Sequence, residues 1–173
     1  MSAPTWSVRR VHALDDAQIG ELAGVLIDCV EGGASVSFMH PLSRERAVAF
    51  WRRVAQGVGE HALLVAEDAR GLCGTVQLVL DQPENQPHRA ELSKMLVHRR
   101  ARRQGLGAAL MRAAEATARE CGKTLLVLDT ANDEAERLYE RLGWTRVGVI
   151  PDYALLPQGG LCATTVFYRN LGR

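Results

Sequence analysis

Four arginines and two glycines are packed into residues 98–107, HRRARRQGLG, in a 173-residue chain whose formal net charge is only +1. The segment follows a strand-like stretch, Arg89–Val97, and precedes a helical pattern that begins at Leu106. Backbone N–H groups at the start of a helix lack an intrahelical partner and point outward beside the positive end of the helix dipole. Glycine at 105 and 107 lets a ligand approach the backbone closely, and the arginines attract anions. The pattern predicts a pyrophosphate site in this turn.

Two familiar phosphate motifs are absent from the chain. There is no G-x-x-x-x-G-K-[ST] sequence, and residues 105–110 lack the third small residue of G-x-G-x-x-G. These absences disfavour an ATPase and a dinucleotide-dependent dehydrogenase. Taken alone, the arginines are also compatible with an exposed basic loop. A nucleic-acid partner is disfavoured, because such proteins usually carry a broad basic excess.

Composition points to an ordinary globular protein without a metal site. The five histidines show neither H-x-x-x-H nor H-E-x-x-H spacing. The four cysteines form no C-x-x-C pair, which predicts free thiols in a reducing compartment. The first ten residues lack the apolar segment of a signal peptide, and no run approaches the ~20 apolar residues that a membrane span needs. We expect a cytoplasmic protein with a single domain over residues 1–173.

Hydrophobic periodicity divides the chain into alternating elements. Strands are expected at residues 5–11, 61–68, 72–80, 89–97, 124–130, 144–149 and 161–168. Helices are expected from Asp15 or Asp16 to about Glu31, and at residues 43–57, 106–122 and 132–142. This order, β-α-α-β-β-β-α-β-α-β-β, predicts an α/β (α+β) fold with a mixed central sheet.

A second segment supports the pyrophosphate interpretation and identifies a family. Residues 102–107 resemble the [RQ]-x-x-G-x-[GA] signature of the GCN5-related N-acetyltransferases (GNAT), and residues 132–144, NDEAERLYERLGW, resemble that family's N-x-x-A-x-x-L-Y-x-x-x-G-[FW] segment. The second match holds at every fixed position: Asn132, Ala135, Leu138, Tyr139, Gly143 and Trp144. The order of elements is also similar to the family's. The resemblance implies the GNAT acyl-CoA N-acyltransferase fold and an acetyl-CoA-dependent N-acetyltransferase.

Three further stretches resemble the tabtoxin-resistance acetyltransferases, a subgroup that acetylates a toxic β-lactam amino acid. They are residues 31–39, Arg89–Val97 and residues 145–160. The resemblance implies direct transfer, in a ternary complex, to the primary amine of a small amino-acid-like toxin or antibiotic. A protein or peptide N-acetyltransferase and a non-catalytic acyl-CoA-binding sensor are the alternatives. A homodimer through residues 161–168 is left open, and neither nucleic acid nor membrane is expected as a partner.

The resemblance also assigns the cofactor site. Acetyl-CoA would lie where the two central parallel strands splay apart, and Asn132 would contact its pantetheine arm. One backbone amide near Met95 or Leu96 would polarise the thioester carbonyl. The residues implied in cofactor binding are Met95, Leu96, Val97, Arg102, Arg103, Gln104, Gly105, Leu106, Gly107, Asn132 and Tyr139.

Acetyl transfer needs two proton movements, because the acceptor ammonium must lose a proton and the departing thiolate must gain one. Tyr139 matches the family's acid. Glu91 and Asp129 are the candidate bases, and we rank Glu91 first. Structural roles remain open for each: a core tyrosine, an ion-pair partner of Arg89, and a turn cap.

The acceptor side is expected in residues 31–42 and 151–160, which resemble the variable parts of the family. Acidic side chains there would pair with a cationic group of the acceptor, and aromatic side chains would form the walls of the pocket. The predicted residues are Asp28, Glu31, Phe38, Asp152 and Tyr153.

Overall fold

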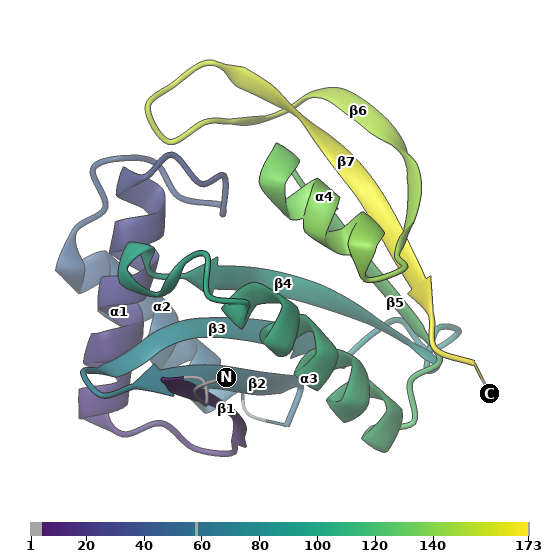
Figure 1. The fold of residues 1–173 in the computed structure, drawn as a ribbon, viewed down its shortest axis with the longest axis horizontal. Helices are drawn as coiled ribbons and strands as arrows, with labels where there is room; N and C mark the ends of the chain where they lie inside the picture. The colour runs from purple at the N-terminus through teal and green to yellow at the C-terminus, as the bar shows by residue number, and fades with distance from the viewer. Residues whose placement is uncertain (1–4, 58, 173) are drawn as a thin grey trace.

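The computed structural model describes residues 5–57 and 59–172 and is built on one seven-stranded mixed sheet of order β1-β2-β3-β4-β5-β7-β6 (Figure 1). The strands are β1 (Trp6–Val11), β2 (His61–Asp68), β3 (Gly71–Val79), β4 (Arg89–Val97), β5 (Leu125–Thr130), β6 (Thr145–Leu155) and β7 (Leu161–Asn170). The helices are α1 (Asp16–Glu31), α2 (Arg44–Gln56), α3 (Leu106–Glu120) and α4 (Asp133–Arg141), with a short 3₁₀ helix, η1 (Arg99–Ala101). The expected order and the mixed α/β fold are confirmed.

Strand β2 explains why the sheet is covered on both faces. Leu64 and Ala66 belong to the hydrophobic cluster beneath α3, whereas Leu63 and Val65 belong to the cluster beneath α1 and α2. Successive side chains of a strand point to opposite faces, so a strand that is apolar at consecutive positions must be buried on both sides. Helices α1 and α2 therefore cover one face of the sheet, and α3 covers the other (Figure 1).

Short polar side chains start three of the helices. Asp15 caps α1 in a capping box with Gln18, Ser43 caps α2 and Asn132 caps α4. Helix α3 differs, since its N-cap is Gly105, which has no side chain to cap the first turn. The start of α3 therefore keeps free N–H groups.

Strands β4 and β5 are the parallel pair of the sheet, and they separate early. Their pairing covers Arg89 to Glu91 on β4 and Leu125 to Val127 on β5. Beyond this joint β4 carries a bulge, where its register with β3 shifts and Lys94 has a φ of 52°. The two strands diverge into a V that opens toward η1 and α4 (Figure 1). The expected splay between the central strands is present.

Strand β7 runs two residues beyond its expected end, to Asn170, and β6 departs further from its prediction. We expected it to end at Val149, but β6 continues to Leu155 through a register shift between Ile150 and Ala154. Proline is tolerated at position 151 because β6 is an edge strand with a bulge there. Residues 151–155 of the expected acceptor segment 151–160 are therefore part of a strand.

Two further expectations concern cysteines and membrane segments. All four cysteines, Cys29, Cys73, Cys121 and Cys162, are free thiols, as expected. Within residues 5–57 and 59–172, no helix has both the length and the apolar character needed to span a membrane.

Candidate active site

The turn before α3 has the geometry of an anion site. Arg103 and Gly105 both have left-handed backbones, with φ of 59° and 78°. Such a backbone costs a residue with a side chain about 1–2 kcal/mol, and strain of this kind gathers at functional sites. A Cβ on Gly107 would lie 3.2 Å from Leu138 Cδ2, so glycine there also allows α3 to approach α4. The turn therefore presents uncapped N–H groups to a ligand.

Two of the arginines in this segment hold the turn in place rather than facing a ligand. The Arg99 backbone N–H donates to Asp28 Oδ2 at 2.9 Å, and the Arg99 side chain pairs with the same carboxylate. The Arg100 guanidinium pairs with Asp68 at 3.0 Å, a contact that lowers the pKa of the Asp68 carboxyl. The basic cluster therefore serves partly as an anchor for the loop.

The anchoring contacts change the interpretation of Asp28. We predicted it as a ligand for the acceptor, but its buried carboxylate lies at the end of α1 beneath η1 and lines neither of the cavities described below. Its position fits a structural role, because it ties α1 to the segment that leads into the turn before α3.

A cleft of about 380 Å³ lies between the diverging strands. It extends from the turn before α3, along the end of β4, to α4. The predicted cofactor residues that line it are Met95, Leu96, Val97, Arg102, Arg103, Gly105, Leu106, Gly107, Asn132 and Tyr139. Gln104 does not line it, and its side-chain amide donates instead to the Arg100 carbonyl at 3.3 Å. The structure thus brings ten of the eleven predicted cofactor residues together.

Two residues of α4 combine packing with exposure to the cleft. Asn132 Oδ1 accepts from the Ala135 N–H at 3.0 Å, so the residue caps the helix while it lines the cleft. The Tyr139 ring packs against Phe167 and Trp144 at centroid distances of 5.7 and 6.1 Å. Burial, helped by the charge of Asp129, raises the pKa of Tyr139 to about 12. Its hydroxyl therefore stays protonated at neutral pH.

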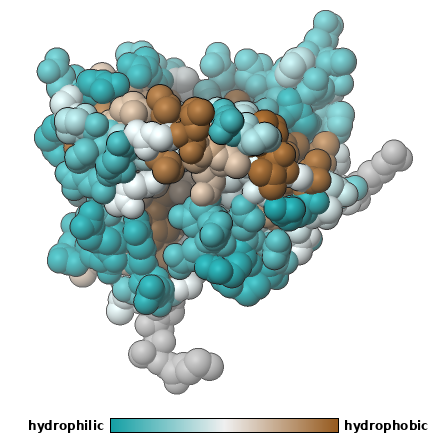
Figure 2. Space-filling view, turned by 90° about the horizontal axis from the view of Figure 1, so that it is seen from above, coloured by the Kyte–Doolittle hydropathy of each residue, from teal (hydrophilic) through white to brown (hydrophobic). Residues whose placement is uncertain are grey.

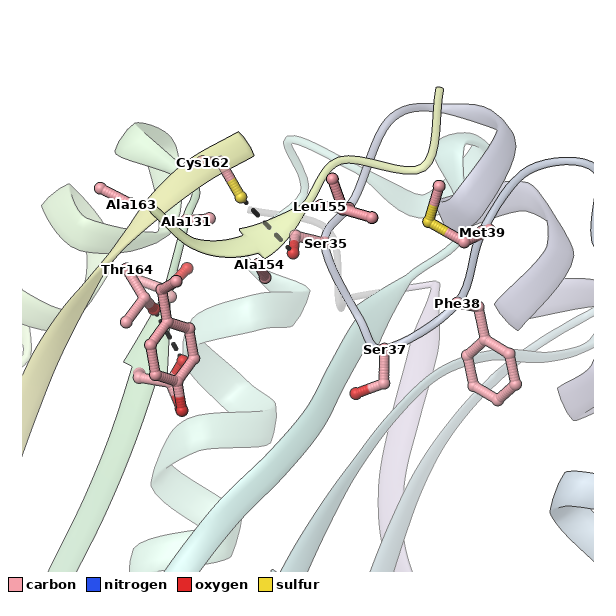
Figure 3. A pocket seen from close by; sticks show the side chains of 13 residues that line it. Ser35, Ser37, Phe38, Met39, Ala131, Ala154, Leu155, Cys162, Ala163 and Thr164 are labelled. Atoms are coloured by element: carbon pink, nitrogen blue, oxygen red, sulfur yellow. Dashed lines mark hydrogen bonds between the residues drawn. The ribbon is translucent and has the colours of Figure 1, made fainter. Parts of the chain in front are cut away.

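A second cavity, of about 320 Å³, adjoins the cleft (Figure 3). The loop between α1 and α2 forms one wall, and the end of β5 with the β6–β7 hairpin forms the other. Its lining residues are Ser35, Ser37, Phe38, Met39, Asp129, Thr130, Ala131, Tyr153, Ala154, Leu155, Cys162, Ala163 and Thr164. Ser35, Thr130 and Ala131 line both cavities, so the two meet at the carboxyl end of β5.

The structure brings only part of the predicted acceptor set to this second cavity. Phe38 and Tyr153 line it, as expected for wall residues. Glu31 and Asp152 are exposed and line neither cavity. Asp152 lies in the bulge of β6 with a φ of 51°, a conformation that the sequence pattern did not indicate.

The two candidate bases lie in different environments. Asp129 lines the second cavity, and its Oδ2 accepts a hydrogen bond from Thr164 Oγ1 at 2.7 Å. Its charge also acts on Tyr139 in the cleft. Glu91 is half-exposed, pairs with Arg89 at 2.7 Å and lines neither cavity. The structure thus places Asp129, and not Glu91, where the cavities meet.

Sequence reasoning missed Ser37, Lys94 and Thr164. Lys94 Nζ donates to Ser37 Oγ at 3.1 Å, and this bond joins the β4 bulge to the loop of the second cavity. A bulge and a loop conformation leave no periodic signal, so these contacts could not be anticipated. Thr164 sits in a strand that was expected, but its contact with Asp129 depends on the pairing of β5 with β7.

Solved structures with the same fold are named as acetyltransferases. The yncA structure from Salmonella typhimurium, solved with acetyl-CoA, is 22% identical, aligns over 98% of this chain and 95% of its own, and gives a TM-score of 0.79. A GNAT superfamily phosphinothricin acetyltransferase from Sinorhizobium meliloti, in complex with acetyl-CoA, is 20% identical over 97% and 89% of the two chains, with a TM-score of 0.80. A ribosomal-protein-alanine N-acetyltransferase from Brucella melitensis is 20% identical over 95% and 99%, with a TM-score of 0.78. These likenesses establish the acyltransferase fold.

Sequence similarity then gives the family. The model of the Acetyltransferase (GNAT) family matches residues 32–144, which include the loop of the second cavity, the turn before α3 and α4. The chain belongs to the Acetyltransferase (GNAT) family. The prediction of an N-acetyltransferase is confirmed at this level.

Proposed function

We propose that this protein transfers the acetyl group of acetyl-CoA directly to a primary amine of a small molecule held in the second cavity. The observation that carries the proposal is the meeting of the two cavities at the carboxyl end of β5, where Thr130 and Ala131 line both. A cofactor in the cleft and an acceptor in the second cavity would then be in contact, as transfer within a ternary complex requires.

The chemistry of the cleft suits acetyl-CoA. The uncapped start of α3 supplies N–H donors for a pyrophosphate, with Arg102 and Arg103 beside them. Beyond Glu91 the backbone of β4 has no partner in β5, so Met95 to Val97 can pair with the amide groups of a pantetheine arm. Acetyl-CoA supplies an activated acyl group on a sulfur leaving group.

Asp129 and Tyr139 are suited to the two proton movements. The Oδ1 atom of Asp129 remains available beside the Oδ2 atom that Thr164 holds, and it would accept a proton from the acceptor ammonium, directly or through water. The protonated hydroxyl of Tyr139 would donate to the departing sulfur, and the second proton that the nitrogen loses as the amide forms would replace the proton that Tyr139 gives. We prefer Asp129 to Glu91 as the base, because Glu91 is engaged with Arg89 outside both cavities.

The size of the second cavity favours a small acceptor over a protein. At about 320 Å³ it lies at the lower end of the range for small-molecule pockets. Phe38 and Tyr153 provide apolar walls, and Asp129 provides a single acidic group for an ammonium. An amino-acid-like toxin or antibiotic has these features. The resemblance to the tabtoxin-resistance subgroup and the phosphinothricin acetyltransferase among the solved structures support this class.

A second copy of the chain is the partner that the surface suggests. Large apolar side chains gather on the face formed by β6 and β7, which is seen from above in Figure 2. The exposed members on this hairpin are Val147, Val149, Ile150, Tyr153, Leu155, Leu161 and Tyr168. Since exposed apolar patches mark interaction sites, we propose a homodimer through this hairpin, with light scattering as the test.

We further propose that residues 1–173 form one cytoplasmic domain. Both hydrophobic clusters pack against the same sheet, and the four cysteines are free thiols, as expected in a reducing compartment.

Thermal unfolding with and without acetyl-CoA tests the cofactor site. At ~100 times the dissociation constant, a specific ligand adds ~2.7 kcal/mol to the free energy of unfolding and raises the midpoint by several degrees. CoA release with a panel of small amines then tests transfer. No thermal shift at millimolar acetyl-CoA would refute the cofactor site. A thermal shift without CoA release in the presence of any amine would indicate a protein that binds acetyl-CoA but does not transfer its acetyl group.

A further inference from the structure

The hydrogen bond between Ser37 and Lys94 joins two strained residues. Both backbones are left-handed, with φ of 76° at Ser37 and 52° at Lys94. The part of the chain that the structure describes contains four non-glycine residues of this kind, and two of them meet in this single bond. Left-handed backbone at residues with side chains persists only where the surroundings impose it, and it clusters at binding sites.

Lys94 carries a partly buried positive charge. Its Nζ lies 5.9 Å from the centroid of the Phe50 ring, and within residues 5–57 and 59–172 no carboxylate pairs with it within 4.0 Å. Burial lowers its pKa, and the more distant charge of Asp129 acts in the opposite direction. A desolvated charge is unfavourable unless a counter-charge accompanies it.

The other lysine of the chain provides a contrast. Lys94 and Lys123 are its only two lysines. The ammonium of Lys123 donates to the carbonyls of Leu80 and Pro87 at 2.9 and 2.8 Å, so its polar contacts are supplied by the fold. Lys94 donates to one serine hydroxyl at the wall of a cavity.

The two walls of the second cavity differ in polar character: one carries the carboxyl group of Asp129, and the other carries the Ser37 hydroxyl, which is bonded to an ammonium outside the lining. Asp129 and Thr164 lie on the wall made by β5 and β7, with the carboxylate facing the cavity. Ser37 lies on the opposite wall, with its hydroxyl directed toward the space between the strands (Figure 3). Because Ser37 Oγ accepts from Lys94, its own proton is free for an acceptor group in the cavity.

We infer that Ser37, positioned by Lys94, binds an anionic oxygen of the acceptor, while Asp129 receives the amine on the opposite wall. The acceptor is then a small zwitterion that carries a primary amine and a carboxylate or a similar oxyanion. This inference rests on the proposed function and narrows its substrate class. Ser37 is the residue in contact with the acceptor, and Lys94 is a positioning residue that acts through it.

Matched pairs of amines test the inference. The probes are α-, β- and γ-amino acids, each compared with its own carboxamide, and CoA release gives kcat/KM for both members. Wild-type protein is expected to prefer the acid member of its best pair by at least about tenfold. Lys94→Met should lower this preference about tenfold or more, through KM for the acid rather than through kcat. Ser37→Ala should act in the same direction.

Lys123→Met is the matched control, because it removes the same charge far from the cavity. It should leave the acid-to-amide preference unchanged even where it lowers stability. Lys94→Gln separates charge from hydrogen bonding, since an amide can still donate to Ser37, and it should retain more of the acid's affinity than Lys94→Met. An equal loss for acid and amide would show a merely structural role for Lys94 and overturn the inference. A best acceptor without an anionic group would overturn it as well.

Binding separates failure of this inference from failure of the proposed function. If no pair is acetylated although acetyl-CoA raises the unfolding midpoint, transfer to small amines is refuted. Thermal unfolding in the presence of CoA then tests, without any catalytic step, whether Ser37 and Lys94 bind an anionic group. Acid members should raise the midpoint of wild-type protein, and not that of Lys94→Met. Absence of a shift with every acid would overturn the inference.

Discussion

Replacement of Tyr139 by phenylalanine separates the chemistry of the hydroxyl from the packing of the ring. The ring contacts with Phe167 and Trp144, at 5.7 and 6.1 Å between centroids, survive the change. No hydrogen bond to the hydroxyl is formed within the described residues 5–57 and 59–172, so its removal leaves no other polar group there without a hydrogen-bond partner. At neutral pH we expect the free energy of unfolding to change by less than ~1 kcal/mol.

The effect of Tyr139→Phe on the rate should be much larger. A positioned acid contributes roughly 10²–10⁴-fold to a rate, or about 3–5 kcal/mol of activation free energy. We therefore expect kcat to fall by about 100-fold or more, while the dissociation constant of acetyl-CoA changes by less than about threefold. CoA release gives kcat, and isothermal titration gives the dissociation constant. An unchanged kcat, or equal losses in rate and affinity, would refute the role of Tyr139 as the acid.

The raised pKa of Tyr139 gives an independent test at alkaline pH. Its value of about 12 in the folded protein exceeds the ordinary value of 10.0, so between these limits the folded state holds this proton more tightly than the unfolded state does. Stability from this group is fully present below pH 10 and is lost as the pH rises toward 12, by roughly 3 kcal/mol in total. Urea unfolding at pH 9 and 11 should show a smaller alkaline loss for Tyr139→Phe than for wild type. Equal losses would contradict the burial of the phenol.

Asp129→Asn should lower kcat by about 100-fold and leave the affinity for acetyl-CoA unchanged, whereas Glu91→Gln should change kcat by less than about threefold. If assays of CoA release show the larger loss for Glu91→Gln, Glu91 is the base. Asp28→Ala should lower the free energy of unfolding by roughly 2–4 kcal/mol in urea and weaken acetyl-CoA binding, because it frees the Arg99 segment. Gly105→Ala should lower the free energy of unfolding by about 1 kcal/mol and weaken acetyl-CoA binding. The cause is the strained φ of 78° and not a steric clash, since nothing lies within 4 Å of the added Cβ. Unaltered binding in either variant would argue against that residue's part in shaping the turn.

Much of the fold could be predicted because its signals are local. Three helix starts follow from Asp15, Ser43 and Asn132, whose side chains bond within their own first turns. Strand β6 was predicted too short because it is exposed at most positions and has no alternation of apolar and polar residues to mark its extent. Its length is set by pairing with β7, which a single segment does not reveal.

The candidate site divides in the same way. The turn before α3 and Tyr139 belong to continuous motifs, and the structure places both along one cleft. Asp28 and Arg99 are 71 residues apart, and Ser37 and Lys94 are 57 apart. Their roles depend on which segments the fold brings together. Residue type alone therefore suggested a ligand at Asp28, where the structure has an anchor for the turn.

The short pairing of β4 with β5 is the pivot about which the two halves of the sheet would turn if they moved. Three residue pairs, ending at Glu91 and Val127, connect the two halves of the sheet, and both cavities lie toward the diverging ends of these strands. Val97 lies six residues, or about 20 Å, beyond Glu91, so a rotation of about 5° at the pivot moves the far ends by roughly 2 Å. A misplacement of about 1 Å can lower an enzymatic rate 10²-fold. Repacking of the buried residues Ala90 and Leu126 at the pivot is therefore expected to change catalytic alignment without touching either substrate.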